Sequence, residues 1–422
     1  MDVKAAAPTP CAGQPDDGFA TLFAGYVQRN ADVLLAQVAV PTAATVNTTE
    51  GADAIPDTGA LSTETIERAL HLLGLLLQRP AMWPTTRTLL LTLAPGMEQA
   101  GLRRRWLEIL HEGIGLSQLA GDAASTGELE MHLGLLYQLL GEFAQAERAY
   151  AAALRCFETL AAAEAQARAL NRLAHIAKLE SRFTEASTLA ERAAALLAPE
   201  SAEWGFAHFV RGVIALEQRD FPTAISQLRL SLDSWRQYGS RRQLAWGYRN
   251  LGAALFQARE YDEAAECTRQ AIAHLGEVGD GVQQAIAHMN LGAIHVEVGD
   301  MEASIEEYVR AESPLLRAHD ILHLAMLYNN LGYTYCKQCI WSQAEQAYVH
   351  SISYWKKLHN TAALVNVMDG LAIVYSKSGK QTEAVTLFEQ ALALTDQIES
   401  AKSRQHYREM VARHLAEVHI KM

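Results

Sequence analysis

The chain has 422 residues, of which 50% are hydrophobic and 20% are charged, so it can bury a substantial core and differs from a disordered polymer. Its net charge of −12 argues against nucleic acid or an anionic membrane as the main partner, because both require a basic surface. The five cysteines are too few and too scattered for a disulfide framework. The N-terminus has no secretory apolar segment, and no apolar run is long enough to span a bilayer. We therefore expect a cytoplasmic protein.

The first third of the chain is irregular. Residues 1–18 are rich in Ala, Pro and Gly, and we expect a disordered tail there. Residues 19–60 combine a helical pattern over 19–40 with a low-complexity linker of Thr, Ala, Gly and Asp. Residues 61–122 have helical periodicity but do not follow the repeat that comes next, as is usual for terminal repeats.

From residue 123 to 402 one pattern recurs seven times with a period near 40. Each unit carries a Leu-Gly pair or a related pair, with a small residue twelve positions after its second member. The pairs are Leu133-Gly134, Leu173-Ala174, Arg211-Gly212, Leu251-Gly252, Leu291-Gly292, Leu331-Gly332 and Leu371-Ala372. Small residues let two helices approach closely, and a larger residue such as Tyr308 or Tyr348 fills the gap. The pattern predicts seven helical hairpins, followed by a polar capping helix over 403–422.

Four polar residues stand near the expected start of a second helix. Thr184, Asp262, Ser342 and Thr382 have side chains that favour the N-cap position. Ser342 and Glu345 also have the spacing of a capping box. We therefore expect these side chains to begin their helices.

The motif Leu-Gly-x-x-Tyr, followed by Ala-x-x-x-Phe/Tyr-x-x-Ala, resembles the tetratricopeptide repeat. The period of 40 and the Asn-Leu-Gly triplets at 250–252, 290–292 and 330–332 are similar to the longer-helix class of Pins/LGN-type adaptors and kinesin light chains. The resemblance is also close to MalT-like regulators and the sensor arms of signalling ATPases. It implies an all-α fold, a right-handed superhelical solenoid of antiparallel helical hairpins whose concave groove binds peptides or protein segments. The chain has no phosphate-binding loop and no DNA-reading helix, so in such a system it would be the sensor part.

Four positions on the first helix of each unit point away from the hairpin core, into the inner groove if the family geometry holds. A face that only water touches should be polar, yet units 3 to 6 place Phe, Trp, Met and Tyr there. Such residues, with a few amides and an Arg, can anchor an amphipathic helix or an extended peptide. The candidate partner-binding residues are Phe206, Phe209, Trp246, Arg249, Asn250, Phe256, Met289, Asn290, Met326, Asn329, Asn330, Tyr333 and Asn366.

Two alternatives stay open for this face. It is buried by a tight superhelix, or the helix expected over 19–40 covers it. The asparagines 250, 290 and 330 could grip the backbone of a bound chain. We favour a second interpretation, in which they satisfy carbonyl groups of the neighbouring hairpin.

Two short motifs could carry chemistry. Cys336 and Cys339 form a lone C-x-x-C at the end of a first helix, where the helix dipole opposes a thiolate, and no second pair completes a zinc site. His319 and His323 have the spacing of a zincin pair, but Asp replaces the catalytic Glu and His319 falls in an expected loop. We therefore expect neither an enzyme nor a metal or cofactor site.

The sequence favours a non-catalytic scaffold that binds a protein or peptide segment, with no nucleic acid and no membrane as partner. A sensor arm of a bacterial signalling system is the alternative, and a metal- or thiol-dependent enzyme is the third hypothesis. The identity of the partner and the oligomeric state are left open.

Overall fold

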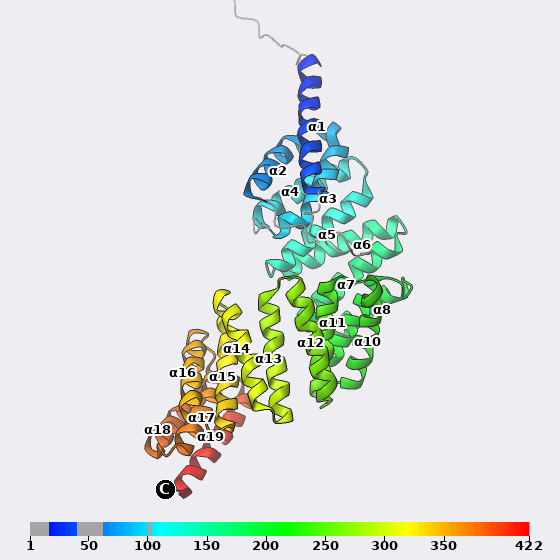
Figure 1. The fold of residues 1–422 in the computed structure, drawn as a ribbon. Helices are drawn as coiled ribbons and strands as arrows, with labels where there is room; N and C mark the ends of the chain where they lie inside the picture. Colours follow the sequence, from blue (N-terminus) through cyan, green and yellow to red (C-terminus); the bar gives the residue numbers. More distant parts are fainter. Residues whose placement is uncertain (1–16, 40–61, 100–102, 422) are drawn as a thin grey trace, which may run out of the picture. The chain divides into compact units, whose positions relative to one another are not determined.

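The computed structural model describes residues 17–39, 62–99 and 103–421, and within these ranges it is helical with no strand (Figure 1). The helices of the first part are α1 (Asp17–Ala39), α2 (Thr63–Leu76), α3 (Trp83–Gln99), α4 (Arg103–Leu119), α5 (Ala123–Leu139), α6 (Phe143–Thr159), α7 (Ala163–Leu179), α8 (Phe183–Ala195) and α9 (Ala202–Glu217). Then follow α10 (Phe221–Tyr238), α11 (Arg241–Gln257), α12 (Tyr261–Glu277), α13 (Gly281–Val298), α14 (Met301–Arg317), α15 (Ile321–Lys337), α16 (Trp341–Lys357), α17 (Thr361–Lys377), α18 (Gln381–Leu394) and α19 (Ala401–Lys421). Short 3₁₀ turns lie at Pro80–Met82 and Thr395–Gln397. The expected all-α fold of helical hairpins is confirmed.

The chain forms two compact units, Met1–Val210 and Arg211–Met422, so that their boundary falls inside α9. The sequence predicted one continuous array from 123 to 402 and did not indicate this division. Residues 1–16 of the expected tail and residues 40–61 of the expected linker lie outside the described residues, whereas residues 17 and 18 belong to α1.

The repeat of 40 residues consists of two halves of 20. A residue with left-handed backbone (φ from 50° to 88°) ends most of these halves, and the next helix begins two residues later. The junctions between α8 and α9 and between α10 and α11 are exceptions. In the second unit these residues follow one another at intervals of 20: Arg259, Gly279, Gly299, His319, Cys339, His359 and Gly379. From α11 to α18 only three residues separate consecutive helices, or two between α13 and α14. Such short connections force consecutive helices back against one another as antiparallel pairs.

The predicted packing of small against large residues is confirmed inside the hairpins. A Cβ atom added at Gly332 would lie 2.8 Å from Cγ and Cδ1 of Tyr348, and one added at Gly292 would lie 2.6 Å from Cε1 of Tyr308. Both tyrosines are buried. The rings therefore occupy the space that a side chain on the first helix would need.

The predicted N-caps are wrong. α16 begins at Trp341, so Ser342 is already inside the helix, and no side chain caps it. Helices α8, α12 and α18 also start before Thr184, Asp262 and Thr382, without a side-chain cap. The tight left-handed turn brings the large apolar residue itself to the first helical position. Side-chain caps instead come from the residue before the helix: Ser240, Asp280, Asp320 and Asn360 cap first helices, and Asp220 and Asp300 cap the second helices α10 and α14.

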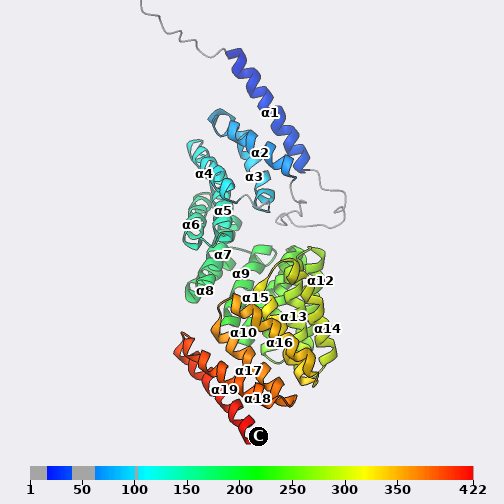
Figure 2. The ribbon, with the colours of Figure 1, turned by 90° about the vertical axis from the view of Figure 1, so that its left-hand side faces the viewer.

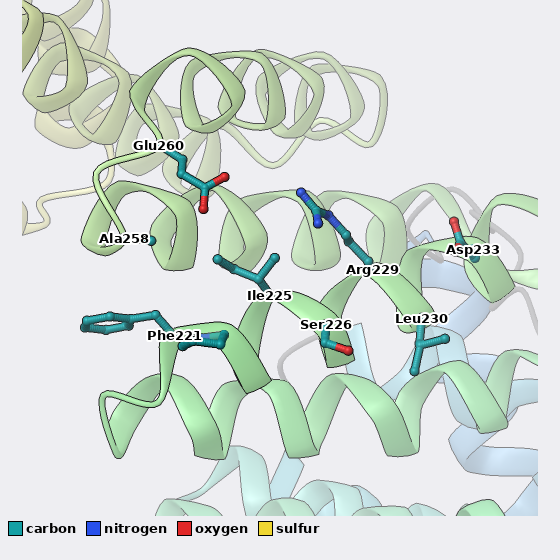
Figure 3. Close-up of a pocket in the computed structure, with 9 residues that line it drawn as sticks. Phe221, Ile225, Ser226, Arg229, Leu230, Asp233, Ala258 and Glu260 are labelled. Carbon is teal, nitrogen blue, oxygen red and sulfur yellow. The ribbon is translucent and has the colours of Figure 1, made fainter.

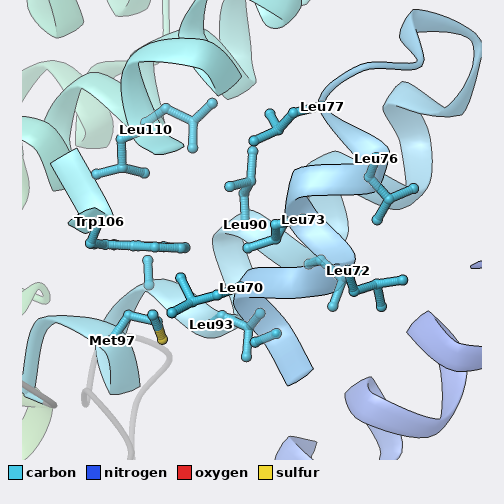
Figure 4. Packing of buried hydrophobic residues seen from close by; sticks show 14 of the residues in the cluster. Leu70, Leu72, Leu73, Leu76, Leu77, Leu90, Leu93, Met97, Trp106 and Leu110 are labelled. Atoms are coloured by element: carbon cyan, nitrogen blue, oxygen red, sulfur yellow. The ribbon is translucent and has the colours of Figure 1, made fainter. Parts of the chain in front are cut away.

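The first unit begins with a leucine-rich core that α1 to α5 share (Figure 4). Leu73, Leu90 and Leu93 of α2 and α3 meet Trp106 of α4 there, and all four are fully buried. On α1 the buried residues are Val27, Ala31 and Leu34. Helix α1 thus packs on α2 and α3 of its own unit.

We predict that Gly332→Ala destabilises the second unit by about 1–3 kcal/mol, because the new methyl group overlaps the buried Tyr348 ring. Urea unfolding followed by circular dichroism measures this. Gly281→Ala is the control, since nothing lies within 4 Å of its Cβ position. A loss of stability in the control, or none in Gly332→Ala, would contradict the packing argument.

Candidate functional site

The first helices of the hairpins in the second unit, α11, α13, α15 and α17, contact one another in sequence. The sides that they turn away from α12, α14, α16 and α18 form a surface that we call the A-helix face. All the predicted binding residues beyond 210 lie on these four helices.

The most accessible part of the A-helix face is a strip on α15. Leu322, Met326 and Tyr333 are 44%, 42% and 45% exposed, and they lie on one side of the helix with the half-buried Asn329 between them. The Lys337 ammonium lies 5.2 Å from the centre of the Tyr333 ring. Leu322 was missed in the sequence analysis, although it precedes Met326 by four residues and so shares its stripe. The strip is apolar, continuous and open to solvent.

The A-helix face of α11 carries a half-buried cation among apolar neighbours. Arg249 is half-buried, and its Nη1 donates to the side-chain oxygen of Gln283 on α13. Among the described residues no carboxylate lies within ion-pair distance of this guanidinium. Burial lowers the pKa of Arg249, and the charge of Asp280 only partly opposes that shift. Arg249 is therefore a desolvated cation with unused donors, close to the half-buried Trp246 and Phe256.

The predicted asparagine row does not act as one set. Asn250 is half-buried and its amide donates to the carbonyl of Trp246, 2.8 Å away on its own helix. The side chain of Asn330 forms a hydrogen bond with the Tyr308 hydroxyl. Burial raises the pKa of Tyr308 to about 12, and this hydrogen bond opposes the shift. Asn290 is exposed, so two of the three amides have structural partners inside the hairpin array. Asn366, a separate candidate on α17, is also exposed.

Three predicted anchors are buried. Met289 lies in the core that α13, α14 and α15 share. Phe206 and Phe209 belong to the first unit, where the Arg172 guanidinium lies 4.6 Å from the centre of the Phe206 ring. Beside them, the buried Asn171 donates to the Glu203 carboxylate at 2.7 Å. Residues of the first unit therefore already cover both phenylalanine rings.

The C-terminal helix α19 closes the last part of the A-helix face. His414 Nδ1 lies 2.9 Å from both carboxylate oxygens of Asp369, which is buried on α17. Burial raises the pKa of Asp369, while His414 and Arg413 oppose the shift. Val411 and Val418 of α19 are also buried in this contact region. On α17 Asn366 stays exposed, and the rest of the face that α19 does not cover lies on α11, α13 and α15.

Two shallow crevices lie elsewhere, on the side of the second helices. One, of about 530 Å³, runs between α10 and the turn before α12 (Figure 3), and its cation Arg229 is already paired with Glu263 at 2.7 Å. The other, of about 570 Å³, includes Ile305 and Ile340. Ile225 in the first crevice and Ile305 in the second are 80 residues, or two repeats, apart. Each crevice therefore lies at the same place in its repeat, between one second helix and the turn before the next. Neither contains a predicted binding residue.

The motifs considered for chemistry lack the required environment. Burial raises the pKa of Cys336, which opposes thiolate formation, and Cys339 is exposed at a left-handed turn position. His323 Nδ1 lies 2.7 Å from Asp320, which caps α15, and His319 lies in the preceding turn. The described residues contain no group of three or more His, Cys, Asp or Glu side chains that could hold a metal ion. Every helix within the described ranges is too short or too polar to cross a bilayer.

Known proteins resemble this chain in its repeats. A family model of the tetratricopeptide repeat matches residues 323–397, from α15 to α18. The STAND protein (signal transduction ATPase with numerous domains) with a tetratricopeptide repeat sensor from Pyrococcus horikoshii is similar at 13% identity and a TM-score of 0.61, over 97% of this chain and 66% of that chain. The apo form of the quorum sensor NprR from B. thuringiensis is similar at 15% identity and a TM-score of 0.53, over 67% of this chain and 79% of that chain. No protein with a curated description matches.

At these identities the similar structures show the fold alone, and the family match shows what kind of repeat builds it. The hairpins of α11 to α14 continue the matched pattern with the same 20-residue halves and the same contact between glycine and a larger residue. Residues 323–397 therefore match tetratricopeptide repeats, within a longer array of helical hairpins.

We predict that a maleimide reagent modifies Cys339 much faster than Cys336 in the folded chain, because Cys339 is exposed and burial raises the Cys336 pKa. Peptide mass mapping after short exposure gives the two rates. The same experiment in urea, where both thiols are accessible, is the control. A faster reaction at Cys336 would restore the thiol-chemistry hypothesis.

Proposed function

We propose that the chain is a cytoplasmic, non-catalytic binding protein that holds a segment of another protein on the A-helix face of its second unit. The observation that carries this proposal is the open strip of Leu322, Met326 and Tyr333 on α15. When a partner covers apolar side chains that lie on one side of a helix and are exposed to water, the free energy of the complex falls. Asn329 between them can donate to and accept from a peptide backbone.

The form of this surface favours a polypeptide over a small molecule. Small-ligand sites enclose most of the ligand surface. The strip on α15 is open along the helix, and both crevices described above lie on the other side of the hairpins. An amphipathic helix or an extended segment can contact Met326 and Tyr333 together with neighbouring residues of α11 and α13.

Arg249 adds a charge preference to this proposal. A half-buried guanidinium without a carboxylate is costly, and an acidic group supplied by the partner would remove that cost. Gln283 already holds one edge of the guanidinium, so its remaining donors are oriented before the partner arrives. We therefore propose that the bound segment carries a carboxylate near its apolar anchors.

A sensor arm of a signalling system is the second candidate. It is favoured by the similarity over 97% of this chain to a protein described as having a tetratricopeptide repeat sensor. In that case the segment bound on the A-helix face is either the signal molecule that the arm detects or the part of the partner protein that receives the signal. Both candidates use the same surface, and the experiments below test that surface.

We predict that Met326→Ala/Tyr333→Ala weakens binding at least about tenfold, because each truncation removes apolar contact area from the interface. Peptides selected from a random library on the wild-type chain serve as probes, and fluorescence anisotropy gives their dissociation constants. Val309→Ala/Val349→Ala is the matched control, since these residues are exposed to a similar degree on α14 and α16. The proposal fails if the first variant binds as the wild type does, or if only the control loses affinity.

We predict that Arg249→Gln weakens the binding of selected peptides that contain Asp or Glu by about tenfold, since a charge-assisted hydrogen bond contributes on the order of 1.5–3 kcal/mol. Versions of the same peptides with Asn or Gln instead should bind both chains equally. Arg269→Gln, on the exposed side of α12, controls for the loss of one positive charge. Equal losses for both kinds of peptide would show that Arg249 does not read a carboxylate.

A further inference from the structure

Helix α1 has two apolar sides, and only one of them is packed. Val27, Ala31 and Leu34 are buried in the core shared with α2 and α3. On another side Leu22, Tyr26 and Val33 are 72%, 57% and 50% exposed. Figure 1 and Figure 2 show α1 in dark blue at the edge of the first unit, with its outer side away from α2 and α3.

The exposed residues have the spacing of a coiled-coil seam. Leu22, Tyr26, Arg29 and Val33 follow one another at steps of four, three and four, and Ala36 comes three residues later. All five are exposed. An apolar side that packs on the core of its own domain is usually broader, whereas steps of four and three that alternate are typical of a narrow a/d seam that meets one other helix.

We propose that this seam, Leu22 to Val33, pairs with the same seam of a second copy of the chain, with the two helices antiparallel. The steps of four, three and four read the same in both directions, which a two-fold interface requires. A dyad between residues 27 and 28 places Leu22 opposite Val33 of the second copy. It also places Tyr26 opposite Arg29 of the second copy.

The charge of Arg29 decides the orientation. In a parallel pair the two Arg29 side chains would face one another in one layer of the seam, and like charges repel there. In the antiparallel pair each guanidinium lies against a tyrosine ring, where a cation–π contact is favourable. Arg29 forms no ion pair with a described residue, and it lies beside Gly25, whose Cβ position is 3.9 Å from Nη1. Its guanidinium is therefore available for the ring of the second copy.

Cysteine cross-linking tests the pairing and its direction. Chains with Leu22→Cys and chains with Val33→Cys are oxidised separately and as an equal mixture, and peptide mapping identifies the disulfide between positions 22 and 33. We expect this disulfide in the mixture and little cross-linking through position 22 or 33 in the separate samples. Cross-linking of position 22 with itself indicates parallel helices and would overturn the proposal, as would a mixture without the expected disulfide.

Sedimentation equilibrium gives the second readout. We expect the mass of the wild-type chain to rise from 46.3 kDa toward twice that value with concentration. Leu22→Glu/Val33→Glu should weaken the association at least about tenfold, because in the antiparallel pair it places two carboxylates opposite one another at each end of the seam. Val309→Glu, an exposed valine on α14, should leave it unchanged, and circular dichroism confirms that both variants are folded. A monomeric wild type, or an equally strong dimer of the seam variant, would overturn the proposal.

Discussion

Two hairpins of the second unit, α13–α14 and α15–α16, depend on one contact, in which an aromatic ring of the second helix lies over a glycine of the first. Tyr308 covers Gly292 and Tyr348 covers Gly332, and in each case a Cβ atom on the glycine would overlap the ring. Because this contact uses the facing sides of the two helices, the opposite side of the first helix takes no part in the hairpin. The A-helix face is formed by these opposite sides, and its exposed strip on α15 can contact a partner.

The sequence predicted the hairpins well because their packing repeats with the chain. A small residue and a large residue that recur at a constant separation indicate a contact between the two helices of one hairpin. Gly332 and Tyr348 make this contact in the structure. The helix starts were predicted wrongly, since they depend on the left-handed turn residue, which at Cys339 has no distinctive side chain. Turn geometry, and not the polar residue Ser342, determines where α16 begins.

The candidate site was less predictable, because residues at one repeat position meet different neighbours. Arg249 and Asp369 both stand two residues before the repeated Leu, yet Gln283 contacts the first and His414 of α19 the second. Phe206 has the same relation to its unit as Met326, and only Met326 is exposed. Helical periodicity identifies the side on which a residue lies. It does not show which side chain of another element covers that side, as α19 covers α17.

Hydrogen exchange measured with and without a bound peptide tests the central claim most directly. If a protein segment occupies the A-helix face, the peptide slows amide exchange in α11, α13 and α15, including the strip around Met326 and Tyr333. Exchange in α14 and α16 should change much less, since these helices lie behind the occupied side. Protection confined to α10, α12, α14 and α16, near the crevices of the other side, would contradict the account.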